Sequence, residues 1–301
     1  MLKLPDMWAF SGTEHYISPG AVERYKLGYY KDNRQAGGAG LDLDRLLWNY
    51  KKRAWKHADF TIVTPSKWLG ECAKESVLFS HFRVENIANP IDLSVFRPAE
   101  SKQSLRSEMG LPTDKHLVLF GSQLADTDPR NGYRHLRRAL SILQAGDLDI
   151  GNLEILVFGT KEKGTEILHG FPAHRLGTIH DERELVAMYA AADVMVLPTE
   201  ADNLPNTIQE ATACGTPCVG FNVGGMPDMI VHRQTGYLAE PFDSAELAHG
   251  IAWVLANKGD SLSDKVRQHA SRIFDPASRV SDYMSLYREL IEARRGPQSG
   301  R

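Results

Sequence analysis

Two carboxylates and a turn lie close together in the segment EADNLPNTIQEATACGTPCVGF, residues 200–221. Asp202 and Glu210 are eight residues apart, which is roughly 12 Å along a helix at about 1.5 Å per residue. The paired acids of glycoside hydrolases lie only about 5 to 9.5 Å apart, so such a pair is disfavoured. The spacing suits a ligand with a hydroxyl-bearing ring at each end and a diphosphate between them. We therefore expect Glu210 to accept from ribose hydroxyls and Asp202 from sugar hydroxyls.

A simpler interpretation of the same two acids needs no ligand. Glu210 would be a solvated helix residue and Asp202 a turn former. Glu200, the third acid of the segment, lies outside the eight-residue spacing, and we expect it to be a solvated loop residue.

The residues between the two acids predict a helix with a ligand at its start. Asn203 is expected to cap the helix through its side chain, and Pro205 to take the first helical position. The helix should stop at Gly215. Its free amide groups and positive dipole end suit a phosphate, and we expect the amides of Asn203 and Leu204 to stabilise a departing diphosphate.

The elements that hold this segment follow a regular alternation from about residue 60. Short β-branched or apolar runs alternate with helical patterns, which predicts βαβ units and a parallel sheet. The run DVMVLPT ends directly before Glu200, at the strand end where such sheets bind ligands. Strands are predicted from Phe60, Val84, His116, Leu153, His174, Asp193, Thr216 and Thr235. Helices are predicted over Tyr133–Ala145, Glu182–Ala191, Thr207–Cys214, Ser244–Ala256 and Ala277–Ala293.

The pattern divides the chain into three parts. Residues 88–98, ANPIDLSVFRP, read as a connector because prolines, an Asn and an Asp bracket a few apolar residues. We expect residues 1–92 to be an incomplete first domain and residues 93–275 to be a complete doubly wound, Rossmann-like domain. Residues 276–301 should be a helix that packs back across the cleft, followed by a disordered tail.

Composition excludes several other classes of protein. A net charge of -3 over 301 residues gives no general basic field for nucleic acid. Three cysteines without regular spacing argue against a disulfide framework. No apolar run reaches the length of a signal peptide or a membrane span. We expect a cytoplasmic protein with no cofactor and no metal, because the histidines lack ligand spacing.

One helical segment, RLLWNYKKRAWKH at residues 45–57, leaves two interpretations open. Its Lys and Arg residues interleave with Trp48, Tyr50 and Trp55, as in a helix that lies at a membrane surface. Alternatively, Trp48 and Trp55 form a core stripe and the basic residues are a solvated face.

The acidic segment resembles the signature of the retaining glycosyltransferases of family four, which have the GT-B architecture of two facing Rossmann-like domains. The family pattern is an acidic residue, seven residues, then Glu-Ala-x-Ala-Cys-Gly-x-Pro-Val-Val. This chain has Asp202, seven residues, then EATACGTPCV. VGGMPDMI and TGYLAEPFDSAELAHGI also resemble family segments. DMWAFSGTEHY and NPIDLSVFRP resemble bacterial exopolysaccharide transferases of the colanic-acid type.

The resemblance implies roles for further residues and shows departures. Ile179 falls where the family's backbone contacts the base. The family's phosphate-binding Arg and Lys correspond to Ser122 and Asn131, which leaves Arg130 as the nearby cation. Pro5 stands where relatives carry a sugar-facing His, and the chain is expected to begin inside the first domain.

The implied function is transfer of a sugar, with retention, from a nucleoside diphosphate donor to a glycan or lipid-linked acceptor in exopolysaccharide synthesis. Such an enzyme would contact the inner membrane surface peripherally and use Asp202 and Glu210 to position the donor. The alternative is a truncated relative that binds nucleotide sugars without transferring them, which Pro5 and Asn131 favour.

Overall fold

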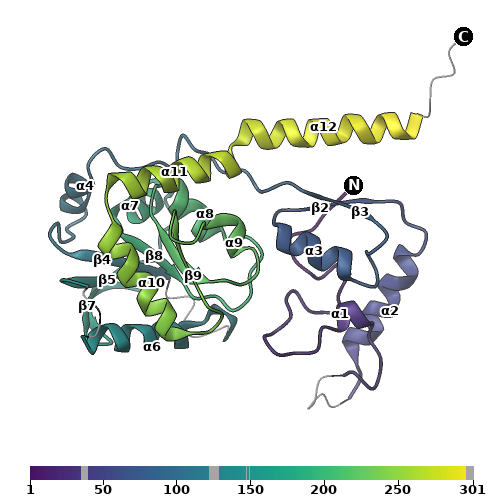
Figure 1. Cartoon of the computed structure of the whole chain (residues 1–301), viewed down its shortest axis with the longest axis horizontal. Helices are drawn as coiled ribbons and strands as arrows, with labels where there is room; N and C mark the ends of the chain where they lie inside the picture. The colour runs from purple at the N-terminus through teal and green to yellow at the C-terminus, as the bar shows by residue number, and fades with distance from the viewer. Residues whose placement is uncertain (35–39, 122–128, 147, 149, 296–301) are drawn as a thin grey trace, which may run out of the picture.

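The computed structural model describes residues 1–34, 40–121, 129–146, 148 and 150–295. The chain forms two units, each built on a parallel sheet (Figure 1), so the predicted α/β class is confirmed. The first sheet has the order β1-β2-β3. Its strands are β1 (Leu2–Lys3), β2 (Thr61–Thr64) and β3 (Arg83–Asn86), and its helices are α1 (Arg24–Leu27), α2 (Leu43–Trp55) and α3 (Lys67–Glu75).

The second unit contains a seven-stranded sheet with the order β10-β9-β8-β4-β5-β7-β6. All neighbouring pairs are parallel except β6 with β7. The strands are β4 (His116–Gly121), β5 (Leu153–Phe158), β6 (Lys163–Leu168), β7 (Phe171–Gly177), β8 (Val194–Leu197), β9 (Cys218–Phe221) and β10 (Gly236–Ala239). The sequence order of the strands reverses between β4 and β8, which makes their carboxyl ends the place where such sheets bind ligands.

Helices cover both faces of this sheet because its central strands are apolar on both sides. Along β4, Leu117 and Leu119 belong to one buried cluster, whereas Val118 and Phe120 belong to the other, as the period of two in a strand requires. The helices are α4 (Lys102–Glu108), α6 (Tyr133–Gln144), α7 (Glu182–Ala191), α8 (Asn206–Ala213), α9 (Met226–Met229), α10 (Ser244–Asn257) and α11 (Asp260–Phe274), with the 3-10 helix η1 (Pro129–Asn131) before α6.

The two units are connected by residues that are distant in sequence. The Ser66 hydroxyl, at the start of α3, hydrogen-bonds the Asn203 side chain, and the Lys67 amide donates to Asp228 at 2.6 Å. The last helix, α12 (Pro276–Arg295), runs from the second unit to the first (Figure 1). Its Leu286 packs against Val63 and Ile87 of the first unit. The predicted tail after α12 lies outside the described residues.

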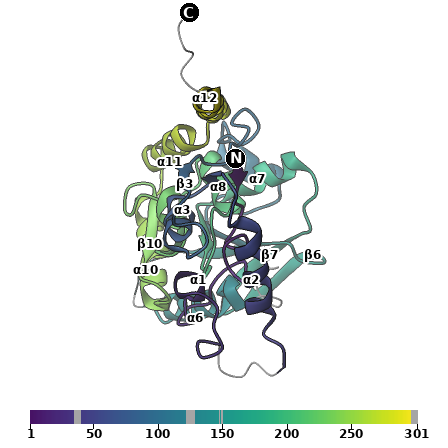
Figure 2. The same ribbon diagram turned by 90° about the vertical axis from the view of Figure 1, so that its right-hand side faces the viewer.

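The segment around Trp48 forms α2 and is a packed helix. Trp48 is buried, and the buried ammonium of Lys51 donates to the carbonyls of Ser11 and Gly12 at 3.2 and 2.7 Å. The Trp55 indole donates to Ala9. The tryptophans therefore face the core, as the packing interpretation expects. The view in Figure 2 shows α2 along the edge of the first unit.

The outward face of α2 is apolar, which the sequence pattern did not show. Leu43, Leu46 and Tyr50 expose 61%, 55% and 69% of their surface. They are spaced by three and four residues, so they lie on one side of the helix. Within the described part of the chain, no helix is long and apolar enough to cross a bilayer.

Candidate functional site

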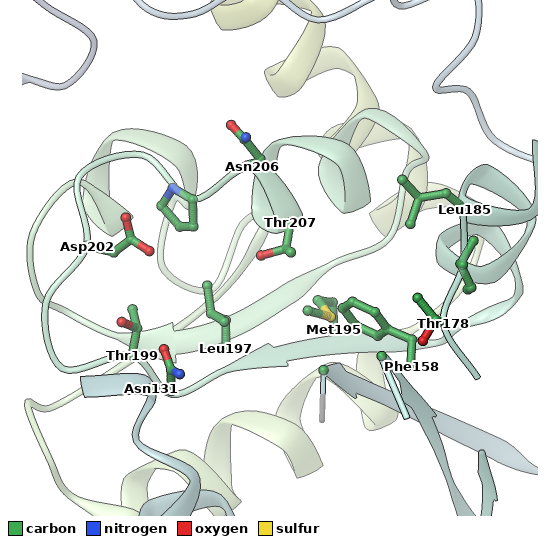
Figure 3. Close-up of a pocket in the computed structure, with 14 residues that line it drawn as sticks. Asn131, Phe158, Thr178, Leu185, Met195, Leu197, Thr199, Asp202, Asn206 and Thr207 are labelled. Carbon is green, nitrogen blue, oxygen red and sulfur yellow. The ribbon is translucent and has the colours of Figure 1, made fainter. Parts of the chain in front are cut away.

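A cavity of about 380 Å³ opens where the carboxyl ends of β4, β5 and β8 meet. Gly121, Phe158 and Thr199 line it at the ends of these strands, together with the first turn of α8. Its two ends differ in chemistry (Figure 3): Phe158 and Leu185 lie at a mainly apolar end, whereas Asn131, Thr199 and Asp202 form a polar end. The cavity can therefore accommodate an elongated ligand with one apolar, ring-like end and one polar end.

The loop between β8 and α8 carries Asp202 into the polar end. Its course depends on Gly224 and Gly225, because the loop backbone packs directly on them. The Gly225 amide donates to the Asp202 carbonyl at 3.1 Å. A Cβ on Gly225 would lie 1.6 Å from the Asn203 carbonyl oxygen, and a Cβ on Gly224 would lie 2.0 Å from that of Asp202. Only glycines allow this close approach of two backbones.

The Asp202 carboxyl faces the cavity and is partly buried. Its Oδ1 accepts from the Asn203 amide at 2.7 Å. Burial raises the pKa of Asp202 above its usual range, although the Asn203 amide, Arg130 and the Tyr16 hydroxyl each favour the charged form. A partly buried carboxyl of this kind is a strong acceptor for hydroxyl groups of a ligand.

The prediction that Asn203 caps α8 is wrong. The helix begins at Asn206, with Pro205 at the N-cap position and no side-chain cap. The Asn203 side chain instead donates to the Pro5 carbonyl at 2.7 Å and hydrogen-bonds Ser66. Asn203 therefore joins the two units through its side chain. Pro205 lies one residue before the predicted position, but it lines the cavity.

Of the amides predicted to hold a diphosphate, that of Asn203 is bonded to the Asp202 carboxylate. The Leu204 side chain is buried in the core between the sheet and its helices. The first turn of α8, with Asn206 and Thr207, lines the cavity instead. The uncapped start of α8 thus provides the positive helix end that the sequence placed earlier in the loop.

Glu210 is not among the residues that line the cavity. Its Oε2 accepts from the Tyr189 hydroxyl at 2.8 Å. The Tyr189 ring contacts that of Phe158, with centroids 6.3 Å apart, and Phe158 lines the apolar end. Burial raises the pKa of Glu210, and the Tyr189 hydrogen bond lowers it. Glu210 is therefore near the end of the cavity that is distant from Asp202.

The other predicted donor-binding residues are distributed around the cavity. Asn131 and Ile179 both line it. Arg130 is beside the polar end, where its guanidinium carbon lies 5.2 Å from the centre of the Tyr16 ring. Its carbonyl accepts from the Glu200 amide at 2.7 Å. Ser122 lies outside the described residues.

Glu200 is not the solvated loop residue that the sequence suggested. Its side chain is buried and lies 2.6 Å from Arg134 and 3.3 Å from His135, both on α6. These contacts hold the loop after β8 against α6. Sequence spacing could not show them, because β5, β6, β7, α7 and β8 separate α6 from this loop along the chain.

Tyr16 is a site residue that the sequence did not predict. It lies in a loop of the first unit, yet its ring centre is 5.2 Å from the Arg130 guanidinium carbon, and it favours the charged form of Asp202 and so lowers the pKa of that carboxyl. The segment before α2 has no clear periodicity. Nothing in the sequence therefore placed Tyr16 opposite the loop between β8 and α8, which belongs to the other unit.

Comparison with known proteins matches residues 115–257 to a family described as glycosyl transferases group 1. D-inositol 3-phosphate glycosyltransferase 1 of Catenulispora acidiphila is 30% identical over 71% of this chain and 53% of its own length. N-acetyl-alpha-D-glucosaminyl L-malate synthase of Bacillus anthracis is 32% identical over 69% of this chain and 54% of its own length. The chain spans about half the length of these curated relatives.

Solved structures share the fold. Sucrose-phosphate synthase from Thermosynechococcus elongatus has a TM-score of 0.66 at 22% identity, over 86% of this chain and 65% of its own. Anabaena HepE in complex with UDP-glucose has a TM-score of 0.61 at 17% identity, over 80% and 67%. The architecture therefore matches GT-B glycosyltransferase structures.

Proposed function

Given a chain whose residues 115–257 match the glycosyl transferases group 1 family, we propose that it binds a nucleoside diphosphate sugar and transfers the sugar to a hydroxyl acceptor. The observation that carries the proposal is the cavity at the point where the strand order reverses, apolar at one end and polar at the other. A solved protein of the same fold was crystallised with UDP-glucose.

The donor is proposed to lie along the cavity. Its base contacts Ile179 and Leu185 at the apolar end, its phosphates face the start of α8 and Asn131, and its sugar reaches Asp202. Glu210 is proposed to reach the ribose from beside the apolar end, where its partner Tyr189 packs against Phe158. The polar groups that surround the phosphates include Arg130, which supplies a charge without a metal ion.

Retention at the anomeric carbon is part of the proposal, and the resemblance of the acidic segment to retaining transferases supports it. In that mechanism the residues of this chain position the donor, and the leaving phosphate takes the acceptor proton on the same face of the sugar.

The acceptor side is proposed to be the loops of the first unit around Tyr16. Exopolysaccharide synthesis on a lipid-linked glycan is the acceptor class that the amino-terminal segments favour. The names of the two relatives above point instead to small hydroxyl acceptors, D-inositol 3-phosphate and L-malate. Both classes share a hydroxyl nucleophile, so the donor assay below is independent of the choice.

Turnover of the donor separates the enzyme from a binding relative. We expect the purified chain to hydrolyse or transfer from UDP-glucose or GDP-mannose, and Glu210→Ala to lower kcat/KM by about 10- to 100-fold, because it loses a charge-assisted hydrogen bond to the donor.

Glu246→Ala is the matched control, because Glu246 accepts from Tyr237 at 2.9 Å in the same way that Glu210 accepts from Tyr189, but it lies on α10, which contributes no residue to the lining of the cavity. An equal loss of kcat/KM in both variants would show that Glu210 does not bind the donor. Binding without turnover would favour the alternative, a relative that binds the nucleotide sugar without transferring it. Pro5 and Asn131 favour that alternative.

We further propose that the outward face of α2 rests on the anionic cytoplasmic surface of the inner membrane. Leu43, Leu46 and Tyr50 are exposed and apolar, and the exposed Lys52, Arg53 and Lys56 continue the same helix. A lipid surface with negative headgroups satisfies both the apolar and the basic residues.

The expected result is co-sedimentation with vesicles that contain phosphatidylglycerol and not with purely phosphatidylcholine vesicles. Leu46→Glu should release the protein, whereas Val280→Glu, at a similarly exposed position on α12, should not. Equal binding of the two variants would exclude α2 as the contact.

A further inference from the structure

A second cavity, of about 570 Å³, lies between α6, the turn that joins β6 to β7 and the loop before α10. The helices α6 and α10 pack against each other (Figure 1). The cavity is lined by Arg134, Arg137 and Arg138 of α6, by His169 of the turn and by Phe242 of the loop. The arginines are three and four residues apart, so they share one face of the helix. This concentration of positive charge contrasts with the net charge of -3 of the whole chain.

Most of the positive charge at this cavity has no counter-charge in the protein. Among the described residues, no Asp or Glu lines the cavity. Arg134 lies 2.6 Å from the buried Glu200, whereas Arg137 and Arg138 form no ion pair with any residue that the structure describes. Asp243, in the loop before α10, accepts from backbone amides as the cap of that helix. The charges of Arg137 and Arg138 are therefore left for a ligand.

The two histidines of the cavity are affected by the same positive charge. Burial lowers the pKa of His169, and the charge of Arg137 lowers it further. Burial and the charge of Arg134 also lower the pKa of His135, against the opposing effect of Glu200. An anion in the cavity would relieve this repulsion and accept hydrogen bonds from the guanidinium groups.

The two rings from outside α6 are held in place by contacts of their own. His169 Nε2 lies 3.0 Å from the Tyr133 hydroxyl, and the Phe242 ring contacts that of Phe221, with centroids 5.8 Å apart. His169 and Phe242 have positive φ angles of +50° and +66°, which are uncommon for residues other than glycine. Such conformations persist where the surrounding structure fixes them. This part of the cavity is therefore preformed.

We propose that the cavity between α6 and α10 binds a phosphate group, carried either by a free phosphorylated molecule or by a phospholipid headgroup. Arg137 and Arg138 supply the unbalanced charges, and the fork of donors on a guanidinium group matches the oxygens of a phosphate. None of the residues that line this cavity lines the one at the ends of β4, β5 and β8. The inference therefore does not rest on the proposed function.

The double substitution Arg137→Gln/Arg138→Gln tests the site, because it removes both unbalanced charges and leaves Arg134 on Glu200. Inorganic pyrophosphate, titrated into the full chain by calorimetry, is the probe for a free phosphate. We expect the double variant to bind it about 10- to 100-fold more weakly, since charge-assisted hydrogen bonds are lost. Arg294→Gln/Arg295→Gln, the same change of charge at exposed positions of α12, should leave its binding unchanged.

Co-sedimentation with phosphatidylglycerol vesicles is the probe for a headgroup. If the phosphate belongs to a lipid, Arg137→Gln/Arg138→Gln should weaken vesicle binding by at least about tenfold, because each cation at an anionic surface contributes to binding. The control pair on α12 should not. A loss with either probe supports the site and identifies the source of the phosphate.

Three results would overturn the inference. The first is that neither probe binds the original chain, and the second is that the arginine pair and the control pair change binding equally. The third uses Thr207→Trp, which fills the other cavity at Thr207. Pyrophosphate binding that Thr207→Trp abolishes and Arg137→Gln/Arg138→Gln leaves intact would place the anion in that other cavity.

Discussion

Gly132→Ala is expected to lower the free energy of unfolding by about 4 kcal/mol or more, at the upper end of single substitutions. Gly132 precedes α6 with φ +67°, and a Cβ there would lie 1.8 Å from the carbonyl oxygen of Pro198. That contact is with backbone, so no side-chain rotation relieves it. The end of β8 and the start of α6 must move apart.

The same change should damage the cavity. Asn131 and Thr199, the neighbours of Gly132 and Pro198, both line its polar end. Their separation should weaken UDP or GDP binding by at least about tenfold, because the aligned hydrogen bonds to the diphosphate are lost.

Gly110→Ala is a closely matched control for Gly132→Ala. Gly110 has the same φ of +67°, but a Cβ there meets nothing within 4 Å. Gly110→Ala should lower the free energy of unfolding by only roughly 1 to 2 kcal/mol, the cost of an L-residue in the left-handed region. Urea unfolding of both variants measures the difference. Equal losses would show that conformation alone matters and that β8 and α6 are not in tight contact.

Asp193→Asn is expected to destabilise the second unit by about 3 to 5 kcal/mol, because it leaves a buried guanidinium without its counter-charge. Asp193 precedes β8, and its Oδ2 lies 2.9 Å from Arg106 Nη2, with both side chains no more than 5% exposed. The same oxygen accepts from the Leu117 amide at 2.9 Å. Arg106 also donates to the carbonyls of Ala191 and Lys115. The pair thus ties α4 and the end of α7 to β4 and β8.

The destabilisation caused by Asp193→Asn should become smaller in acid. Burial raises the pKa of Asp193, but the charges of Lys102 and Arg106 and the Leu117 amide outweigh burial and lower it overall. A carboxyl with a lowered native pKa stabilises the fold above its unfolded pKa, about 3.9. The contribution is lost as the pH falls through the lower native value.

Unfolding free energies of the original chain and Asp193→Asn should therefore differ by a constant amount between about pH 5 and 8 and converge in stronger acid. Asp114→Asn, at an exposed ion pair with Lys115, should stay within about 0.5 kcal/mol of the original chain. A difference that grows as the pH falls would contradict the ionised Asp193 described here.

The sequence predicted most of the second unit because its elements are local. The strand before Glu200, the helix around Glu210 and its end near Gly215 follow from apolar runs, a proline and a glycine. The antiparallel edge strand β6 was missed because its exposed residues carry no apolar alternation. The two-residue strand β1 is too short for any periodic signal.

The contacts between the units could not be predicted from the sequence. Asn203 has the residue type of a helix cap, but Pro5 and Ser66 compete for its side chain. Tyr16 lies beside Arg130 of the second unit but comes from a segment without periodicity. Within the second unit, the sequence likewise indicates that Glu200 is a solvated loop residue, whereas in the structure it contacts α6. In each case several helices and strands lie between the partners along the chain, and spacing carries no information over such a separation.

Calorimetric titration of the full chain with UDP, UDP-glucose, GDP and GDP-mannose tests most directly whether the cavity between β4 and β8 is a nucleotide-sugar site. We expect saturable heat with at least one diphosphate and its sugar nucleotide at a single shared site, and loss of that heat when Thr207→Trp fills the cavity at the start of α8. The absence of heat with all four ligands, or binding that Thr207→Trp leaves unchanged, would contradict the assignment.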